Sequence, residues 1–120
     1  MLRIAIHMTA LALVGFLAAG CGTSSADPLD ATPVATSQIS VGDNDFEPVA
    51  AEVPVGTEVI WSWDGDNDHN VVADDFSSDV RSEGSFSHTF DGPGTHTYVC
   101  TLHSGMRGAV VVTDGSRTDG

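Results

Sequence analysis

The chain has 120 residues, and its 17 Asp and Glu against 4 Lys and Arg give a formal net charge of −13 at pH 7. This length predicts a single domain. Because nucleic-acid binding draws on Lys and Arg to neutralise phosphates, the composition argues against a nucleic-acid partner. The acids are scattered among Ser, Thr and Gly, which predicts a uniformly solvated acidic surface. Such a surface suits concentrated salt, since the Debye length falls to ~3 Å at 1 M.

The first twenty residues have the pattern of a secretion signal. Arg3 supplies a positive charge, residues 4–16 are mostly apolar, and small residues precede Cys21. The apolar run is shorter than the roughly 20 residues that a membrane-spanning helix needs. We therefore expect a lipoprotein-type signal peptide at 1–20, and an uncleaved anchor is the alternative.

The residues around Cys21 indicate how the chain is processed. Leu17-Ala18-Ala19-Gly20-Cys21 resembles the lipobox of prokaryotic lipoproteins, although Ala18 replaces the usual Leu. The resemblance implies lipidation of Cys21 and a domain held by acyl chains at the extracytoplasmic face of the cell membrane. Ordinary signal-peptidase cleavage nearby is the alternative. A disulfide between Cys21 and Cys100 is a further alternative in such a compartment.

Residues 21–37 are rich in Thr, Ser, Ala and Pro and show no periodic apolar face. They predict a flexible linker with an r.m.s. span of roughly 20 Å. A folded domain is expected over residues 38–114, followed by a polar tail at 115–120.

Short alternating segments separated by turn residues fill the expected domain. Val59, Trp61 and Trp63 share one face, which we expect in the core. Residues 74–84 read as an irregular segment anchored by Phe76 and Val80. The expected strands are 38–41 at a sheet edge, 49–55, 57–63, 69–73, 85–90, 95–100 and 108–113, with Phe46 beside the second. Seven or eight such strands without helical periodicity predict an all-β fold, a Greek-key β-sandwich.

A thiolate, an imidazole and a thioether recur at three-residue intervals after the strand expected at 95–100. These are Cys100, His103 and Met106. Soft sulfur ligands beside imidazole favour copper, and a trigonal copper site with a weak axial Met needs one more His. His69 is the candidate, because it begins one expected strand while Cys100 ends another.

Other chemistries fit part of this ligand set. With Met106 in the core, His69, Cys100 and His103 would form an open zinc site, because thioether is not a normal zinc ligand. A nucleophilic Cys–His pair is a second alternative, but no oxyanion hole is evident near Cys100. His88 and His96 are expected to be packed or surface imidazoles rather than ligands.

Two stretches resemble plastocyanin-type blue copper proteins of the cupredoxin superfamily. The run Tyr98 to Val112, YVCTLHSGMRGAVVV, is similar to their C-terminal signature, above all to that of the halocyanins of salt-loving archaea. His69-Asn70-Val71-Val72 is similar to their His-Asn-Val strand. The resemblance covers about residues 38–113. Only Ser104 and Gly105 separate His103 from Met106, and the amicyanins share this short spacing.

The resemblance implies one mononuclear type 1 copper and a set of residues around it. The implied copper ligands are His69, Cys100, His103 and Met106. Asn70 is expected to donate its backbone N–H to the Cys100 sulfur and to tie its side chain to Thr101. The exposed edge of His103 would be the electron exit, in an apolar patch of Leu102, Gly105 and Val71.

The function implied is that of a membrane-tethered electron carrier that cycles between Cu(I) and Cu(II) and is not an enzyme. We expect a monomer that docks transiently on membrane-bound respiratory or other redox proteins over a small interface. A copper-binding or delivery protein without electron transfer is the alternative. A copper enzyme such as a nitrite reductase would need a second copper site and further domains.

Overall fold

The computed structural model describes residues 27–115, and over this range the fold is all-β, as predicted. The predicted signal at 1–20, Cys21 and tail residues 116–120 lie outside the described residues. Within the described range, no helix is long and apolar enough to cross a membrane. The strands are β1 (Val34–Ala35), β2 (Gln38–Val41), β3 (Phe46–Glu47), β4 (Ala50–Pro54), β5 (Glu58–Trp63), β6 (Ser85–Thr89), β7 (Gly94–Val99) and β8 (Arg107–Thr113).

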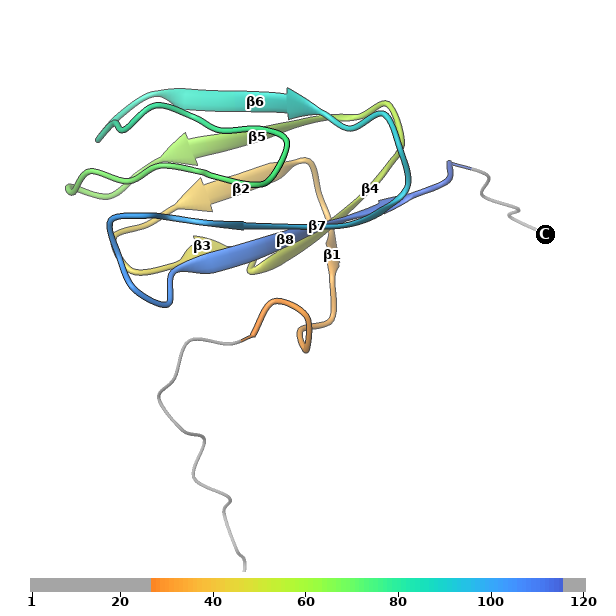
Figure 1. Cartoon of the computed structure of the whole chain (residues 1–120), viewed down its shortest axis with the longest axis horizontal. Coiled ribbons are helices and arrows are strands. Elements are labelled where there is room, and N and C mark those ends of the chain that lie inside the picture. The colour runs from red at the N-terminus through yellow and green to blue at the C-terminus, as the bar shows by residue number, and fades with distance from the viewer. Residues whose placement is uncertain (1–26, 116–120) are drawn as a thin grey trace, which may run out of the picture.

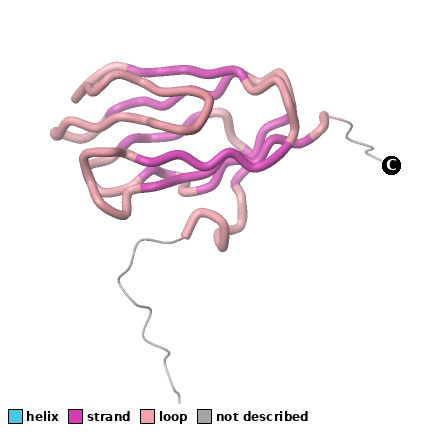
Figure 2. Tube along the Cα trace, viewed as in Figure 1, coloured by secondary structure: helices cyan, strands magenta, loops and turns pink. Residues whose placement is uncertain are grey.

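The strands form two four-stranded sheets, and Figure 1 shows their arrangement as a sandwich. One sheet has the order β1-β4-β8-β7 and the other the order β3-β2-β5-β6. The pairs β4–β8 and β2–β5 are parallel, whereas β7–β8 and β5–β6 are antiparallel. Neighbouring strands are therefore often distant in sequence, as in the predicted Greek-key topology. The loops that join the strands gather at the two ends of the sandwich (Figure 2).

The core lies between the sheets and is fixed by the alternation in β5. Val59 and Trp61 are 0% exposed and Trp63 is 8% exposed, as their shared face predicts. The Trp61 ring meets Tyr98 of the other sheet edge-on, with centroids 5.4 Å apart. It also lies 5.7 Å from Phe86 of β6. The contact with Tyr98 links the two sheets, and the contact with Phe86 links neighbouring strands of one sheet. Both stabilise the core, because large rings bury much apolar area in preferred edge and offset geometries.

Two expectations about the first strands were wrong. β2 is not an edge strand but lies between β3 and β5, because the turn at 42–45 folds the chain back and adds β3 outside it. The Gly42 N–H donates to the Asp45 carbonyl at 3.0 Å and closes this turn. The packed fold also begins before Gln38, since β1 pairs in parallel with β4.

The segment between β5 and β6 differs from the prediction as well. Residues 69–73 form isolated bridges rather than a strand, with His69 opposite Arg81 and Val72 opposite both Ser77 and Val99. Phe76 is buried as expected. Val80, in contrast, is 50% exposed and anchors nothing. The segment is held mainly by backbone hydrogen bonds, which apolar periodicity does not report.

Candidate metal centre

The loop between β7 and β8 carries three of the predicted ligand residues. Cys100 follows β7 directly and Met106 precedes β8, so both ends of the loop are fixed by the strand pair. The Cys100 N–H donates to the Met106 carbonyl at 2.9 Å, and the Met106 N–H donates to the His103 carbonyl at 3.3 Å. Gly105 has φ of 82°, a conformation that glycine adopts without strain. The loop is therefore compact and closed.

His69 is held from outside this loop and is fully buried. Its N–H donates to the Arg81 carbonyl at 2.9 Å, and its carbonyl accepts the Arg81 N–H at 3.1 Å. The Trp63 indole Nε1–H also donates to the His69 carbonyl at 3.1 Å. Three hydrogen bonds thus fix the His69 backbone at the end of the sandwich where the Cys100–Met106 loop lies.

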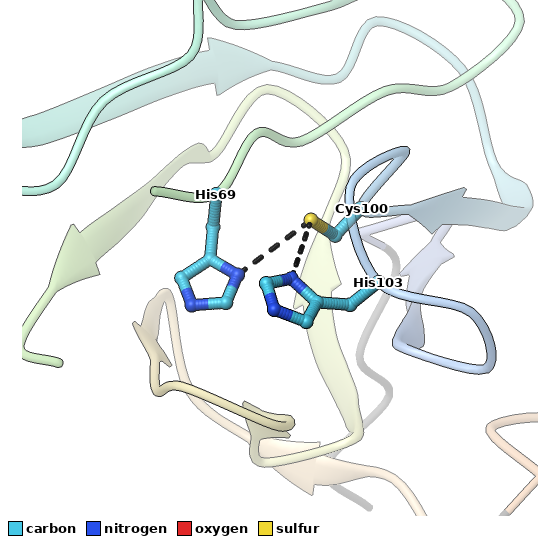
Figure 3. Close-up of side chains that lie close together, drawn as sticks. All are labelled: His69, Cys100 and His103. Atoms are coloured by element: carbon cyan, nitrogen blue, oxygen red, sulfur yellow. Dashed lines mark hydrogen bonds between the residues drawn. The ribbon is translucent and has the colours of Figure 1, made fainter. Parts of the chain in front are cut away.

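The side chains of His69, Cys100 and His103 converge, as Figure 3 shows. The Cys100 Sγ lies 3.6 Å from Nδ1 of His69 and 3.9 Å from Nδ1 of His103. Bonds of about 2.3 Å to sulfur and about 2.0 Å to nitrogen, at trigonal angles, separate these atoms by about 3.7 Å. The three donors therefore fit one first-row metal ion. Cys100 is 4% exposed, whereas a nucleophilic thiol must be reached by its substrate.

Met106 is 2% exposed and stands at the end of the same loop. Its carbonyl bonds to Cys100 as described above, so its backbone is fixed beside the thiolate. The two other His residues that the structure describes lie elsewhere: His88 stacks on Phe76 with centroids 4.4 Å apart, and His96 packs against Phe90 at 4.8 Å. Neither His88 nor His96 belongs to the described cluster of possible metal ligands.

The side chain of Asn70 joins the His69 segment to the loop. Its Oδ1 accepts the Thr101 N–H at 2.8 Å, and its Nδ2 donates to Thr101 Oγ1 at 2.9 Å. The expected tie between Asn70 and Thr101 is thus present. A hydrogen bond from the Asn70 N–H to the Cys100 sulfur is not among those of the described residues.

The surface around His103 differs from the expectation at one position. Leu102 is 49% exposed and Gly105 is exposed, as predicted for an apolar patch. Val71 is fully buried and does not contribute to that patch. Its position next to buried Asn70, inside the bridged segment, removes it from solvent.

One acidic residue near the site was missed by the sequence reasoning. Asp43 Oδ1 lies 3.5 Å from Nε2 of His69. The Asn67 N–H, which donates to this carboxylate, lowers the pKa of Asp43, and the Asp66 N–H and His69 add to the effect against an opposing contribution from burial. No periodicity or motif marks Asp43; the only available signal was an acidic turn directly after a strand.

Known proteins are similar to this chain in sequence and in fold. Residues 34–113 match the family described as copper binding proteins, plastocyanin/azurin family. Halocyanin from Natronomonas pharaonis is 49% identical over an alignment of 77 residues. The match covers 56% of this chain and 47% of that protein, so it spans about half of the length of halocyanin. Amicyanin-alpha from Methylorubrum extorquens is 31% identical over 118 residues, covering 88% of this chain and 99% of that protein.

Solved structures of cupredoxins also resemble this fold. A purple cupredoxin from Nitrosopumilus maritimus superimposes with a TM-score of 0.58 at 29% identity, over 63% of this chain and 98% of that chain. The two-sheet fold and the converging thiolate and imidazoles define a blue copper protein of the cupredoxin class. The chain belongs to the plastocyanin/azurin family of copper-binding proteins. Its cofactor is one type 1 copper, which the donor set fits.

Proposed function

We propose that this protein is an electron carrier whose copper is held by His69, Cys100, His103 and Met106. The observation that carries the proposal is the convergence of the Cys100 sulfur with two imidazole nitrogens at 3.6 and 3.9 Å. Copper bound there supplies one-electron redox chemistry between Cu(I) and Cu(II). Because the fold fixes the donors in one arrangement, little rearrangement accompanies a change of oxidation state.

The route for electrons runs through His103. It is the partly exposed member of the cluster, while His69 and Cys100 are buried. Leu102 and Gly105 give its surroundings an exposed apolar character that a redox partner can cover. The partners proposed are membrane-bound respiratory or other redox proteins that dock transiently, since a small interface allows rapid dissociation.

The protein is proposed to act at the extracytoplasmic face of the membrane, tethered through lipid on Cys21. The lipobox-like sequence supports this, and Natronomonas halocyanin is a relative of the folded part. Fractionation of cells that express the full chain tests the tether: wild type is expected with the membranes and Cys21→Ser in the soluble fraction. Equal distribution of both would contradict the tether without touching the copper site.

A copper-delivery protein is the competing function, and the burial of the donors weighs against it. Delivery requires that a receiving protein reach the ligands, yet His69 is 0% exposed and Cys100 is 4% exposed. A measurement of Cu(I) loss to a competing chelator separates the functions. Slow loss together with rapid, reversible electron exchange at an electrode supports the carrier, and the opposite pattern supports delivery.

The central test is the visible spectrum of the copper-loaded, oxidised protein. A thiolate bond to Cu(II) gives an intense visible absorption, so wild type is expected to be coloured and Cys100→Ser colourless. His88→Gln is the matched control, because His88 stacks on Phe76 away from the cluster, and it should keep the colour. A colourless wild type would refute the proposed function.

A further inference from the structure

The ring nitrogen of His69 that faces away from Cys100, Nε2, needs a hydrogen-bond acceptor in this fold. Its Nδ1 faces the Cys100 sulfur, so Nε2 carries the proton of the neutral, metal-binding ring. That Nε2 is buried and makes no hydrogen bond of normal length and alignment. Ligating His residues almost always donate the second ring N–H to a carboxylate, a carbonyl or water. The group that faces Nε2 is therefore of functional interest.

Asp43 is that group, and its position is fixed independently of His69. Its Oδ1 lies 3.5 Å from Nε2 and accepts the N–H groups of Asp66 at 2.8 Å and Asn67 at 2.9 Å. A Cβ at Gly65 would overlap the same carboxylate, so the 64–68 loop is shaped around it. Two donors and a close backbone approach thus seat the carboxylate against the ring.

The neighbouring charged groups have other partners. Asp64 accepts from the Ser40 hydroxyl at 2.8 Å, and the Arg81 side chain binds Asp79 and the Ser85 carbonyl. Among the described residues, Asp43 is the one whose charged group is paired with the His69 ring. Because hydrogen bonds already fix the His69 backbone, the freedom that Asp43 can remove is rotation of the ring itself.

We propose that Asp43 is a positioning residue, whose carboxylate accepts the Nε2–H of His69 and holds Nδ1 toward the metal. The proposal rests on the function proposed above. A negative acceptor makes the imidazole a better donor and favours Cu(II) over Cu(I). Asp43 therefore lowers the reduction potential, although it touches neither the metal nor a partner.

The test compares reduction potentials of copper-loaded variants in at least 1 M NaCl, where the Debye length of ~3 Å suppresses effects of distant surface charge. Asp43→Ala is expected to weaken Cu(II) binding about tenfold or more. With Cu(I) binding unchanged, each tenfold loss raises the potential by about 59 mV. Asp43→Asn keeps a neutral acceptor for both backbone N–H groups and should shift the potential by less than Asp43→Ala.

Asp64→Asn is the matched control, because it removes one acid from the 64–68 loop, which contacts Asp43, without touching His69. Its potential should equal that of wild type. Equal potentials for Asp43→Ala and Asp64→Asn would overturn the proposal. Gly65→Ala displaces the carboxylate without removing it and should raise the potential like Asp43→Ala, whereas Gly92→Ala, which has open space, should not.

A second readout needs no copper. Nitrogen NMR of the metal-free protein, at a pH where the ring is neutral, reports which ring nitrogen of His69 carries the proton. Wild type and Asp64→Asn should be protonated at Nε2, and Asp43→Ala should lose this preference. An unchanged preference in a folded Asp43→Ala protein would refute the role of Asp43, even if the blue copper function itself had failed its own test.

Discussion

The residues of the metal centre differ in how firmly the fold holds them. His69 is fixed through its backbone by Arg81 and Trp63, and Thr101 beside Cys100 is tied to Asn70. His103 is partly exposed and sits in the middle of the loop. The site therefore has a rigid inner side, which sets ligand geometry, and an outer side that a partner can approach.

Met106 gives the sharpest prediction at the level of one ligand. Replacing it with Gln offers an amide oxygen, a harder ligand than the thioether, which stabilises Cu(II). We expect Met106→Gln to keep copper and lower the reduction potential, because the axial ligand tunes it. Voltammetry of the loaded protein measures this. Met106→Leu, which keeps an apolar side chain but no donor, should raise the potential instead, and an unchanged potential in both variants would show that Met106 is not the axial ligand.

The ion pair between exposed Asp79 and partly buried Arg81 makes a pH-dependent contribution to stability. Arg81 donates to Asp79 Oδ1 from Nε at 3.0 Å and from Nη2 at 2.6 Å, and this lowers the pKa of Asp79 below its ordinary 3.8. A carboxyl whose folded pKa is lowered contributes stability above its unfolded pKa, and this contribution is lost as pH falls through the folded value. Asp79→Asn should thus slightly reduce the free energy of unfolding at pH 7.

Chemical denaturation of the metal-free protein at two pH values tests this sign. The difference between Asp79→Asn and wild type should disappear once the pH is below the lowered pKa of Asp79. Asp75→Asn is the control, since Asp75 is an exposed acid of the same segment that makes no described hydrogen bond or ion pair. A difference that persisted in acid would mean that Asp79 acts through something other than its charge.

At the scale of elements, sequence patterns predicted the features that depend on which side chains within one segment are buried. The alternation in 57–63 identified β5 and its buried face, and the spacing from Cys100 to Met106 identified a soft-metal loop after a strand. The same patterns carry no information on pairing. β2 was expected at an edge because its own residues do not show that β3 folds back beside it.

The pairing of the segment with His69 and the contact between His69 and Asp43 likewise could not be predicted from sequence patterns. Residues 69–73 were expected to form a strand, yet they pair only through isolated bridges, to Ser77 and Arg81 of the following segment and to Val99 of β7. Asp43 reaches His69 only because a turn after β2 and the 64–68 loop meet at one end of the sandwich. Such contacts depend on loop conformations that hydrophobic periodicity does not encode.

At Gly108 one strand lies directly against an aromatic ring of its neighbour, and this predicts a strong effect of a small substitution. It lies in β8 directly opposite Tyr98 of β7, and an added Cβ would come within 2.5 Å of the Tyr98 ring carbon Cζ. Because the ring is buried and cannot move away, Gly108→Ala should destabilise the protein by about 1–3 kcal/mol. Urea denaturation of the metal-free protein measures it. Gly92→Ala should stay within about 0.5 kcal/mol of wild type, and equal losses in both would contradict the packing argument.

At the scale of the whole molecule, the surface beside the metal loop differs in charge from the rest of the surface. The described residues contain two basic side chains, Arg81 and Arg107, and the second is exposed beside the metal loop. Acids cover the rest of the surface without a compensating Lys. Leu102 and Arg107 therefore place an exposed apolar and an exposed cationic side chain at the end where a partner is proposed to dock, while the acidic surface disfavours non-specific association.

The net charge of −13 predicts that folding depends on salt. Repulsion among the acids is long-ranged at 0.1 M salt, where the Debye length is about 10 Å, and is largely screened at 1 M, where it is about 3 Å. The free energy of unfolding of the metal-free protein should thus rise with NaCl, most steeply below about 1 M.

Replacing the exposed, unpaired Asp74, Asp75 and Glu83 with their amides should flatten this dependence on NaCl. Sodium sulfate at equal ionic strength should add a further increase, because excluded salts also strengthen apolar burial. Stability that is independent of NaCl in urea denaturation would show that the acidic surface does not limit folding.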